Sequence, residues 1–464
     1  MTNSDCKTQD TKDDVLFQRA IDILLSTEKK GYPSFVGGLK IASGNEYGLA
    51  SPIDSSIIFG KFQIPEDGTV ATAVKAAEKA FESWSSKTQV ERSDIFREVL
   101  KKVKDQRYNL AACVMLSTGM VIKDCLIEAD RLAEMIEEAC RIEDGAESRG
   151  VWGVLSEHNS SLASPAGFAS IAMITGNTVV SLPSMKCPMP MFVFNNILQA
   201  VGLPDGVFNI TISNESKTDR EMTDDPTVRG LIASGSGDRM EDLMFLPVDD
   251  ELKFVNEIKG MNPIVVYKPG NIKIVADSII ESAFRSAGQR LHSCSKVIVT
   301  DSEREKLISA LREAAKSITV GDPADCKVNS GPLMSVDDLV RFENYIEESY
   351  DNVIFGGKKI EGDGLENGSY VEPAIVVGMT DDCELGSYDT GLPILTIISV
   401  SNIEAAMEEL VNTECGLSAS IFSKDDKAIE SFKEFAEAPC INVNNGTENM
   451  RPGSKNNIMR KFMR

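Results

Sequence analysis

Few side chains in this chain have the type and spacing that catalysis or metal binding requires. Its 464 residues include two histidines, His158 and His292, and Cys294 lies two positions after the second. An imidazole beside a thiol can bind a metal ion or exchange a proton, and an imidazole can also line a ligand pocket. The simpler interpretation is that the two positions drifted in sequence. Because the ten cysteines contain no CxxC pair, we predict no metal site.

Short motifs for nucleotide binding or nucleophilic catalysis are absent from the chain. It has no phosphate loop of the GxxxxGK type, no GxGxxG after a strand, no GxSxG elbow and no HExxH pair. A dinucleotide would therefore have to bind without the common glycine fingerprint.

Composition narrows the range of partners. The chain has 48 basic and 71 acidic residues, a net charge of −23, and 42% hydrophobic residues, as a folded globular protein does. This negative charge repels phosphate backbones and anionic membranes, so we expect no nucleic-acid or membrane partner. No stretch approaches the ~18 apolar residues of a membrane-spanning helix. The polar, acidic start MTNSDCKTQDTKDD is unlike a signal or transit peptide, so we expect a cytoplasmic protein with reduced cysteines.

The elements that must position these side chains follow an alternating pattern. Helical spacing dominates the first third, as in residues 69–84. Strand and helix patterns then alternate at 150–155, 163–174, 176–183, 189–201 and 207–212. A second series starts near residue 255, with strands at 262–267, 296–300, 371–378, 392–400, 417–423 and 441–445 and helices at 274–286, 303–318, 403–412 and 426–436. This rhythm predicts an α/β fold of two doubly wound domains, and the short passage between them predicts a shared cleft.

Several segments resemble the aldehyde dehydrogenase superfamily in order and spacing, over the chain from Phe35 to Thr447. They include RGVWGVLSEHNSS, GNTVVSLPS, AVGLPDGVFNI, LIASGSG, NEIKGMNP, SAGQRLHSCSKVIV and INVNNGT. AACVMLSTGMVIKDCLIEADRLAEMI and SCSKVIV are most similar to the 1-pyrroline-5-carboxylate (glutamate semialdehyde) dehydrogenases. The resemblance implies the aldehyde dehydrogenase fold and the NAD- or NADP-dependent oxidation of an aldehyde to an acid.

The resemblance also implies how the chain divides. Residues 1–130 and 148–257 match the Rossmann-like cofactor-binding domain, and residues 258–440 match the catalytic domain. Residues 131–147 stand where the family has an oligomerisation segment. Residues 441–464 are a truncated C-terminal tail, in which 17 residues follow Thr447. In a homo-oligomer we therefore expect the strand exchange between subunits that is usual in the family to be absent.

The chemistry of the family needs a thiolate, donors for an oxyanion and a base that activates water. By resemblance, Asn159 donates to the oxyanion and Glu257 is the base, but the Gly-Gln-x-Cys nucleophile position holds Leu291. Cys294 stands where the 1-pyrroline-5-carboxylate dehydrogenases carry a second cysteine. In this chain Cys294 is either a packing residue or a relocated nucleophile. Likewise, Asn159 could cap a loop, and Glu257 could belong to a solvated face.

The family's cofactor contacts are partly replaced. Its Lys-Pro-Ser-Glu segment, which binds the adenosine ribose, reads Leu182-Pro183-Ser184-Met185 here. Gly235 and Ser236 retain part of the Gly-Ser-Thr helix start, where a helix N-terminus favours a pyrophosphate. Asp389 replaces the nicotinamide-ribose glutamate and is one methylene shorter. The candidate contacts to NAD or NADP are therefore Ser184, Gly235, Ser236 and Asp389.

Three functions are compatible with the sequence. The first is a catalytically impaired relative that binds a partner subunit, a small carboxylate or a semialdehyde in the old cleft. The second is an active enzyme, either an NAD(P)-dependent dehydrogenase that uses Cys294 or an esterase- or hydratase-like enzyme that uses Glu257 and Asn159. The third is a structural or regulatory protein whose acidic surface binds a basic partner. The combined loss of the thiol and the ribose contacts favours the first function.

Overall fold

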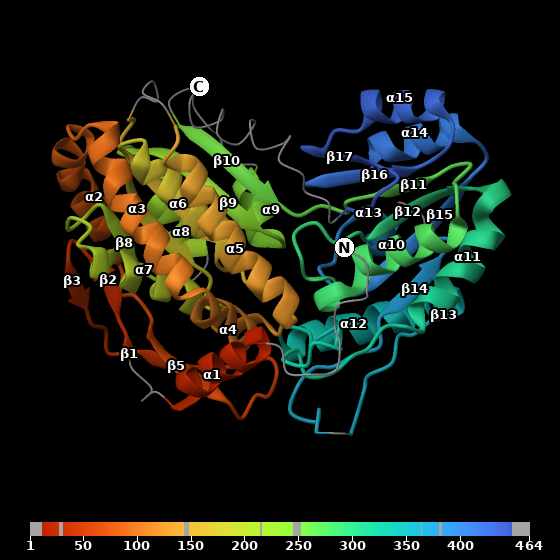
Figure 1. The fold of residues 1–464 in the computed structure, drawn as a ribbon, viewed down its shortest axis with the longest axis horizontal. Helices are drawn as coiled ribbons and strands as arrows, with labels where there is room; N and C mark the ends of the chain where they lie inside the picture. Colours follow the sequence, from red (N-terminus) through yellow and green to blue (C-terminus); the bar gives the residue numbers. More distant parts are fainter. Residues whose placement is uncertain are drawn as a thin grey trace.

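Two seven-stranded sheets, each covered by helices, lie beside one another (Figure 1). The computed structural model describes residues 12–26, 31–142, 148–213, 216–244, 252–362, 364–379 and 383–447. The first sheet has the order β10 (Lys253–Ile258), β9 (Val228–Gly235), β6 (Val151–Ser156), β7 (Thr178–Pro183), β8 (Phe208–Ile210), β2 (Ser34–Val36) and β3 (Leu39–Ile41). The five strands from β10 to β8 are parallel, whereas β2 and β3 add an antiparallel edge.

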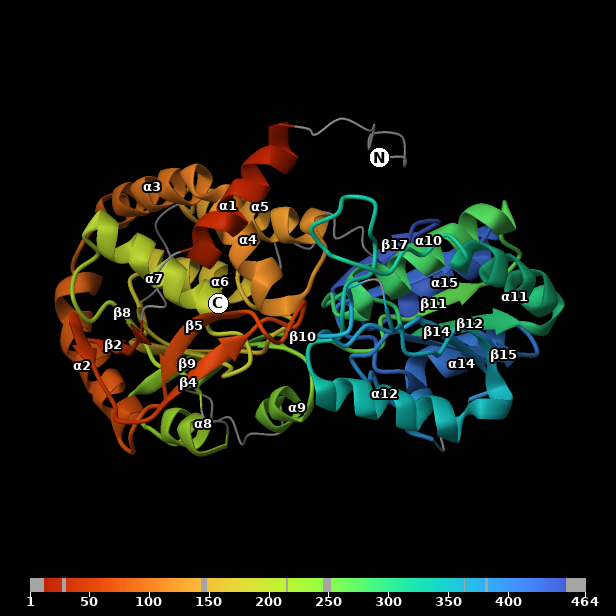
Figure 2. The same cartoon turned by 90° about the horizontal axis from the view of Figure 1, so that it is seen from below.

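Alternation along these strands sends neighbouring side chains into two cores. Val154 and Ile232 pack in a core with α3 (Gln89–Asp105), α5 (Ile122–Ala139), α6 (Ala163–Ile174) and α7 (Met189–Val201). Leu155 and Leu231 point to the other face, where they pack in a core with α2 (Thr69–Ser85). Helices α8 (Ser216–Thr223) and α9 (Asp238–Met244) lie on the side opposite α3 and α5 (Figure 2). The parallel sheet is thus covered on both faces, as its apolar strands require.

The second sheet is built in the same way. Its order is β13 (Val353–Phe355), β14 (Ala374–Val377), β15 (Ile394–Val400), β12 (Lys296–Thr300), β11 (Ile264–Val266), β16 (Ser418–Phe422) and β17 (Cys440–Val443). All neighbouring strands are parallel except β13 and β14. Val297 packs in a core with α10 (Ile272–Phe284) and α11 (Asp301–Ala315), and Ile298 packs in a core with α14 (Ile403–Asn412) and α15 (Asp426–Phe435).

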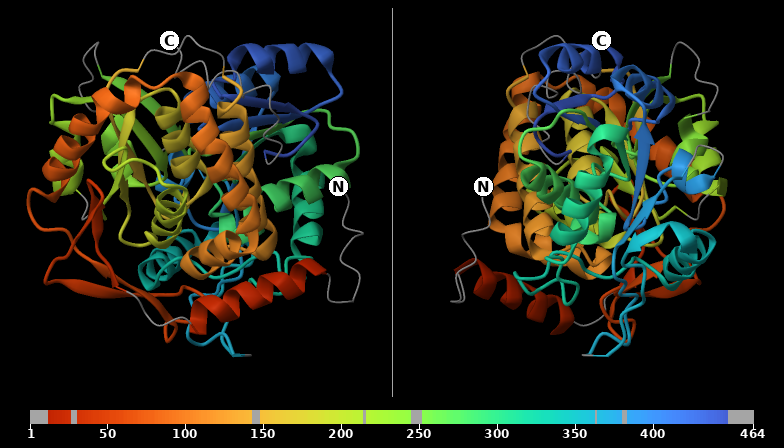
Figure 3. Two further views of the ribbon diagram at one scale, coloured as in Figure 1. Left: turned by 60° about the vertical axis from the view of Figure 1, so that its left-hand side comes forward. Right: turned by 90° about the vertical axis from the view of Figure 1, so that its right-hand side faces the viewer.

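Helix α1 (Lys12–Ser26), drawn in red, lies along the lower edge of the molecule in Figure 3. A third sheet has the order β1 (Gly31–Tyr32), β5 (Ile58–Gln63) and β4 (Glu46–Ala50). Helix α1 packs against α4 (Arg107–Thr118). Helix α12 (Val336–Glu348) begins at Ser335, whose side chain accepts a hydrogen bond from the backbone N–H of Asp338. The short helix α13 (Glu384–Ser387) precedes β15. No helix within the described residues is both long and apolar enough to cross a membrane.

The structure confirms the predicted α/β class and the two largely parallel sheets. The sequence patterns missed β9, β10, α8, α9 and α12. Helices α8 and α9 are short and polar, whereas β9 is an eight-residue buried strand. The domain boundaries and the oligomerisation role of residues 131–147 stay predictions. Of that segment, residues 131–139 belong to α5, and residues 143–147 lie outside the described residues. Most of the predicted tail, residues 448–464, also lies outside them.

Candidate active site

The carboxyl ends of β6 and β9 bring two predicted site residues into contact. Open parallel sheets bind ligands at this edge. Asn159 follows β6 and is buried, and its Nδ2 donates to Oγ of Ser236 over 2.9 Å. Gly235 ends β9 with φ 135°, and a Cβ added there would lie 2.4 Å from Cβ of Glu157. The predicted oxyanion donor and a predicted pyrophosphate contact therefore lie side by side, at a bend that only glycine fits.

Glu257, the predicted base, is a buried residue of β10 with both carboxylate oxygens engaged. Its Oε1 lies 2.6 Å from Nη2 of Arg131 on α5, and its Oε2 accepts a hydrogen bond from Oγ of Ser164 on α6. The Glu257 carboxylate in turn raises the pKa of Arg131. Glu257 is therefore not a solvated surface residue. Its carboxylate forms an ion pair with Arg131 and a hydrogen bond with Ser164.

A polar stripe on α5 runs along this region and was not singled out from the sequence. Asp124, Glu128 and Arg131 are spaced at i, i+4 and i+7, which places them on one face of the helix. Oε2 of Glu128 accepts the backbone N–H of Ala163 over 2.9 Å, and burial raises the pKa of Glu128. The sequence signal for the stripe is the helical spacing of these three charged residues on α5.

The loop that carries Leu291 is fixed by the same stripe. The 3-10 turn η1 (Arg285–Gly288) holds Ser286 and Ala287 at φ 54°, in the left-handed region that few non-glycine residues adopt. Asp124 accepts hydrogen bonds from Nε of Arg285 over 3.1 Å and from Oγ of Ser286 over 2.6 Å. Leu291 is 7% exposed and has no nucleophilic atom. The contacts of Asp124 with Arg285 and Ser286 thus fix the turn that precedes Leu291.

Cys294 lies in an apolar core, away from polar chemistry. Its side chain is buried, its Sγ donates to the carbonyl oxygen of Lys296 over 3.3 Å, and it packs in the core with α10 and α11. Nearby, burial and then the charge of Arg290 hold the pKa of His292 well below its usual value. Within the described part of the chain, no group of three or more His, Cys, Asp and Glu side chains could hold a metal ion.

An arginine of α9 fills the strand edge where an adenosine ribose would lie by resemblance. Arg239 donates through Nη1 to Oε1 of Glu157 over 2.9 Å and through Nε to Oδ2 of Asp219 over 2.6 Å. Its Nη2 also donates to the carbonyl oxygen of Leu182 over 3.3 Å. Burial acts to raise the pKa of Glu157, but His158 and Arg239 outweigh it and lower this pKa to about 2. This cluster was not predicted, because a lone arginine on a short polar helix carries no signal.

Asp389, the one carboxylate among the predicted cofactor contacts, is paired within the chain. Both carboxylate oxygens of Asp389 lie 2.6 Å from Nζ of Lys259, and Oγ of Ser295 donates to Asp389 Oδ1 over 2.5 Å. The Lys259 and Asp389 side chains are only 1% and 5% exposed. Ser184 is buried just beyond β7, where its Oγ accepts the backbone N–H of Lys186 over 3.4 Å. Lys259 and Ser295 therefore already pair with the carboxylate that the resemblance assigns to the nicotinamide ribose.

The sequence matches a known protein family and several of its members. The sequence model of the aldehyde dehydrogenase family matches residues 41–455. An α-ketoglutaric semialdehyde dehydrogenase of Bacillus subtilis is 27% identical over 441 residues, which cover 90% of each chain. A 1-pyrroline-5-carboxylate dehydrogenase of Geobacillus is 24% identical over 456 residues, which cover 93% of this chain and 88% of the relative.

Solved structures share the fold. A variant of 1-pyrroline-5-carboxylate dehydrogenase from Thermus thermophilus superposes with a TM-score of 0.87 at 19% identity, covering 98% of this chain and 92% of the other. The betaine aldehyde dehydrogenase of Staphylococcus aureus, solved with NAD, gives a TM-score of 0.86 at 21% identity, covering 93% and 90%. These likenesses confirm the resemblance read from the sequence segments and the predicted architecture.

Proposed function

Because this chain belongs to the aldehyde dehydrogenase family, we propose that it is a catalytically impaired member that binds a small carboxylate or aldehyde. The observation that carries the proposal is Leu291 at the position of the nucleophile. An alkyl side chain cannot attack a carbonyl carbon, so no thiohemiacetal forms there. Cys294 does not compensate, because it is buried in the core and hydrogen-bonded to a backbone carbonyl.

The residues at the predicted cofactor contacts support the same proposal, because they do not fit a dinucleotide. Asp389 is held by Lys259, and the ribose-binding lysine and glutamate are replaced by Leu182 and Met185. A dinucleotide that used Asp389 would first have to displace a buried ammonium group, which costs several kcal/mol. We therefore derive no hydride-transfer step for this chain.

The class of ligand follows from the relatives and from polar atoms without partners. The names of the two relatives refer to an oxo-acid semialdehyde and to a pyrroline carboxylate, so both act on compounds that carry a carboxylate. Oδ1 of Asn159 and Oγ of Ser293 are buried and lack a hydrogen-bond partner within the described residues. Each unsatisfied buried group costs about 1–3 kcal/mol. Oγ of Ser293 can donate a hydrogen bond to a ligand carboxylate, whereas Oδ1 of Asn159 only accepts and would need a ligand hydroxyl or amine.

A calorimetric titration of the full-length protein with NAD and with NADP tests the proposal. We expect no heat of binding at millimolar cofactor and no NADH formation from 1-pyrroline-5-carboxylate or α-ketoglutaric semialdehyde. Lys259→Gly is the informative variant, because it frees Asp389 and restores the glycine that the family has at this position. Glutarate serves as the carboxylate probe, and we expect it to raise the melting temperature. Micromolar NAD binding with turnover by the unaltered protein would overturn the proposal.

A further inference from the structure

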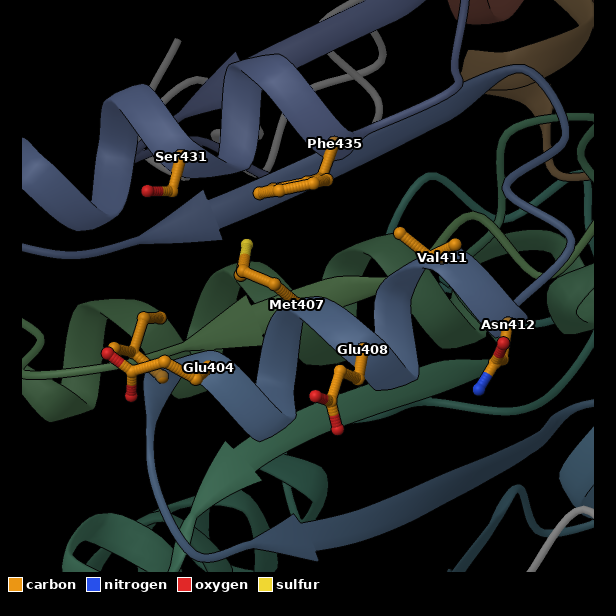
Figure 4. Close-up of a pocket in the computed structure, with 8 residues that line it drawn as sticks. Glu404, Met407, Glu408, Val411, Asn412, Ser431 and Phe435 are labelled. Atoms are coloured by element: carbon orange, nitrogen blue, oxygen red, sulfur yellow. The ribbon is translucent and has the colours of Figure 1, made fainter.

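A groove of about 520 Å³ runs between α14 and α15 on the second sheet. Eight residues line it: Ile403, Glu404, Met407, Glu408, Val411, Asn412, Ser431 and Phe435. In Figure 4, Ser431 and Phe435 on α15 face Met407 on α14. We call this surface the α14–α15 groove.

The α14–α15 groove combines exposed apolar surface with negative charge. Val411 is 57% and Phe435 is 44% exposed, although large apolar side chains are usually buried. Glu404 and Glu408 lie exposed on α14, which carries no lysine or arginine. Such a surface fits an amphipathic helix with apolar anchors and a positive charge.

The end of the same chain has that composition. Residues 451–464 carry five basic residues and no acidic one, in a chain whose net charge is −23. Within them, Ile458, Met459, Phe462 and Met463 stand at i, i+1, i+4 and i+5, the spacing of one helical face. The family match ends at residue 455, so this segment lies beyond it.

The segment is long enough to reach the groove within one molecule. The carbonyl oxygen of Thr447 accepts a hydrogen bond from Oγ of Ser418 over 3.2 Å, and α14 ends at Asn412, six residues before Ser418. Six residues span at most about 20 Å, whereas the nine residues from 448 to 456 reach about 30 Å. A tether of this length also gives a high effective concentration, which favours docking within the chain over docking between chains.

We propose that residues 456–464 dock in the α14–α15 groove of their own molecule, with their apolar face against Met407, Val411 and Phe435. The basic side chains of the segment then neutralise the glutamates of α14. This interaction is independent of the cofactor and of the function proposed above.

Hydrogen–deuterium exchange of the full-length protein tests the docking. We expect Phe462→Glu to speed amide exchange in residues 456–464 roughly tenfold, because a carboxylate cannot enter the apolar groove. Asn457→Glu is the matched control, since it adds the same charge to the same segment on the opposite helical face. On the groove, Glu408→Lys should have the same effect as Phe462→Glu. Its control is Glu305→Lys on α11, where the side chain is 80% exposed and outside the groove.

Three outcomes decide the proposal. Faster exchange in both test variants, unchanged exchange in both controls and protection that persists on dilution support docking within the molecule. Random-coil exchange of residues 456–464 in the unaltered protein overturns the proposal. Protection that disappears on dilution, together with a change from dimer to monomer mass in light scattering, also overturns it and assigns the groove to the segment of a second copy.

Discussion

Replacing Lys259 by methionine should destabilise the protein far more than an exposed lysine replacement does. Nζ lies 2.6 Å from both oxygens of Asp389, and the two side chains are 1% and 5% exposed. Removing one partner of such a pair leaves a buried charge, at a cost of about 3–5 kcal/mol. Ser295 still donates to the carboxylate over 2.5 Å, so we expect the lower end of that range.

Urea unfolding followed by circular dichroism measures this cost. Lys61→Met is the control, because Lys61 pairs with Glu46 over 3.3 Å with side chains 47% and 49% exposed, so its loss should cost less than about 1 kcal/mol. The double variant Lys259→Met with Asp389→Leu removes both charges and should recover most of the loss. Two results would refute the argument that Lys259 and Asp389 form a stabilising buried pair. One is a loss of unfolding free energy in Lys259→Met as small as in the control, and the other is no recovery of that free energy in the double variant.

Three further outcomes follow from the site. The pKa of Glu157 is lowered from 4.5 to about 2, so its stabilising effect is complete above pH 4.5 and is lost as the pH falls towards 2. Arg239→Leu should therefore lower the melting temperature at neutral pH, and the melting temperature of the variant should fall less in acid than that of the unaltered protein. Melting temperatures that fall in parallel with pH in the two proteins would contradict this. Leu291→Cys alone should leave NADH formation at background, because the residues at the predicted cofactor contacts are unchanged; a rate near the typical ~10 s⁻¹ would contradict the proposal. A thiol reagent should modify exposed Cys326 in the native protein and Cys294 only after unfolding, as peptide mass spectrometry would show.

The sequence was sufficient to predict the architecture, because strand and helix patterns are local. Apolar runs that alternate with helical patterns identified β6, β7, β12, β15 and β16. The order and spacing of the matching segments identified the family. The order of the segments also places Leu291 at the position where, by resemblance, the family has its nucleophile. Short polar elements such as α9 were missed, because a single helical turn or two carries too little periodicity to identify.

Only the tertiary structure decided what the candidate residues contact. Glu257 pairs with Arg131 across 126 positions, and Asp389 pairs with Lys259 across 130 positions. No local pattern links such partners, because their distance depends on how α5 packs on the first sheet and how the loop before β15 meets the end of β10. The sequence thus determined which side chains stand at the positions that the resemblance assigns, and the packing of helices on sheets determined which internal charges pair with the buried carboxylates, since a buried carboxylate needs a partner.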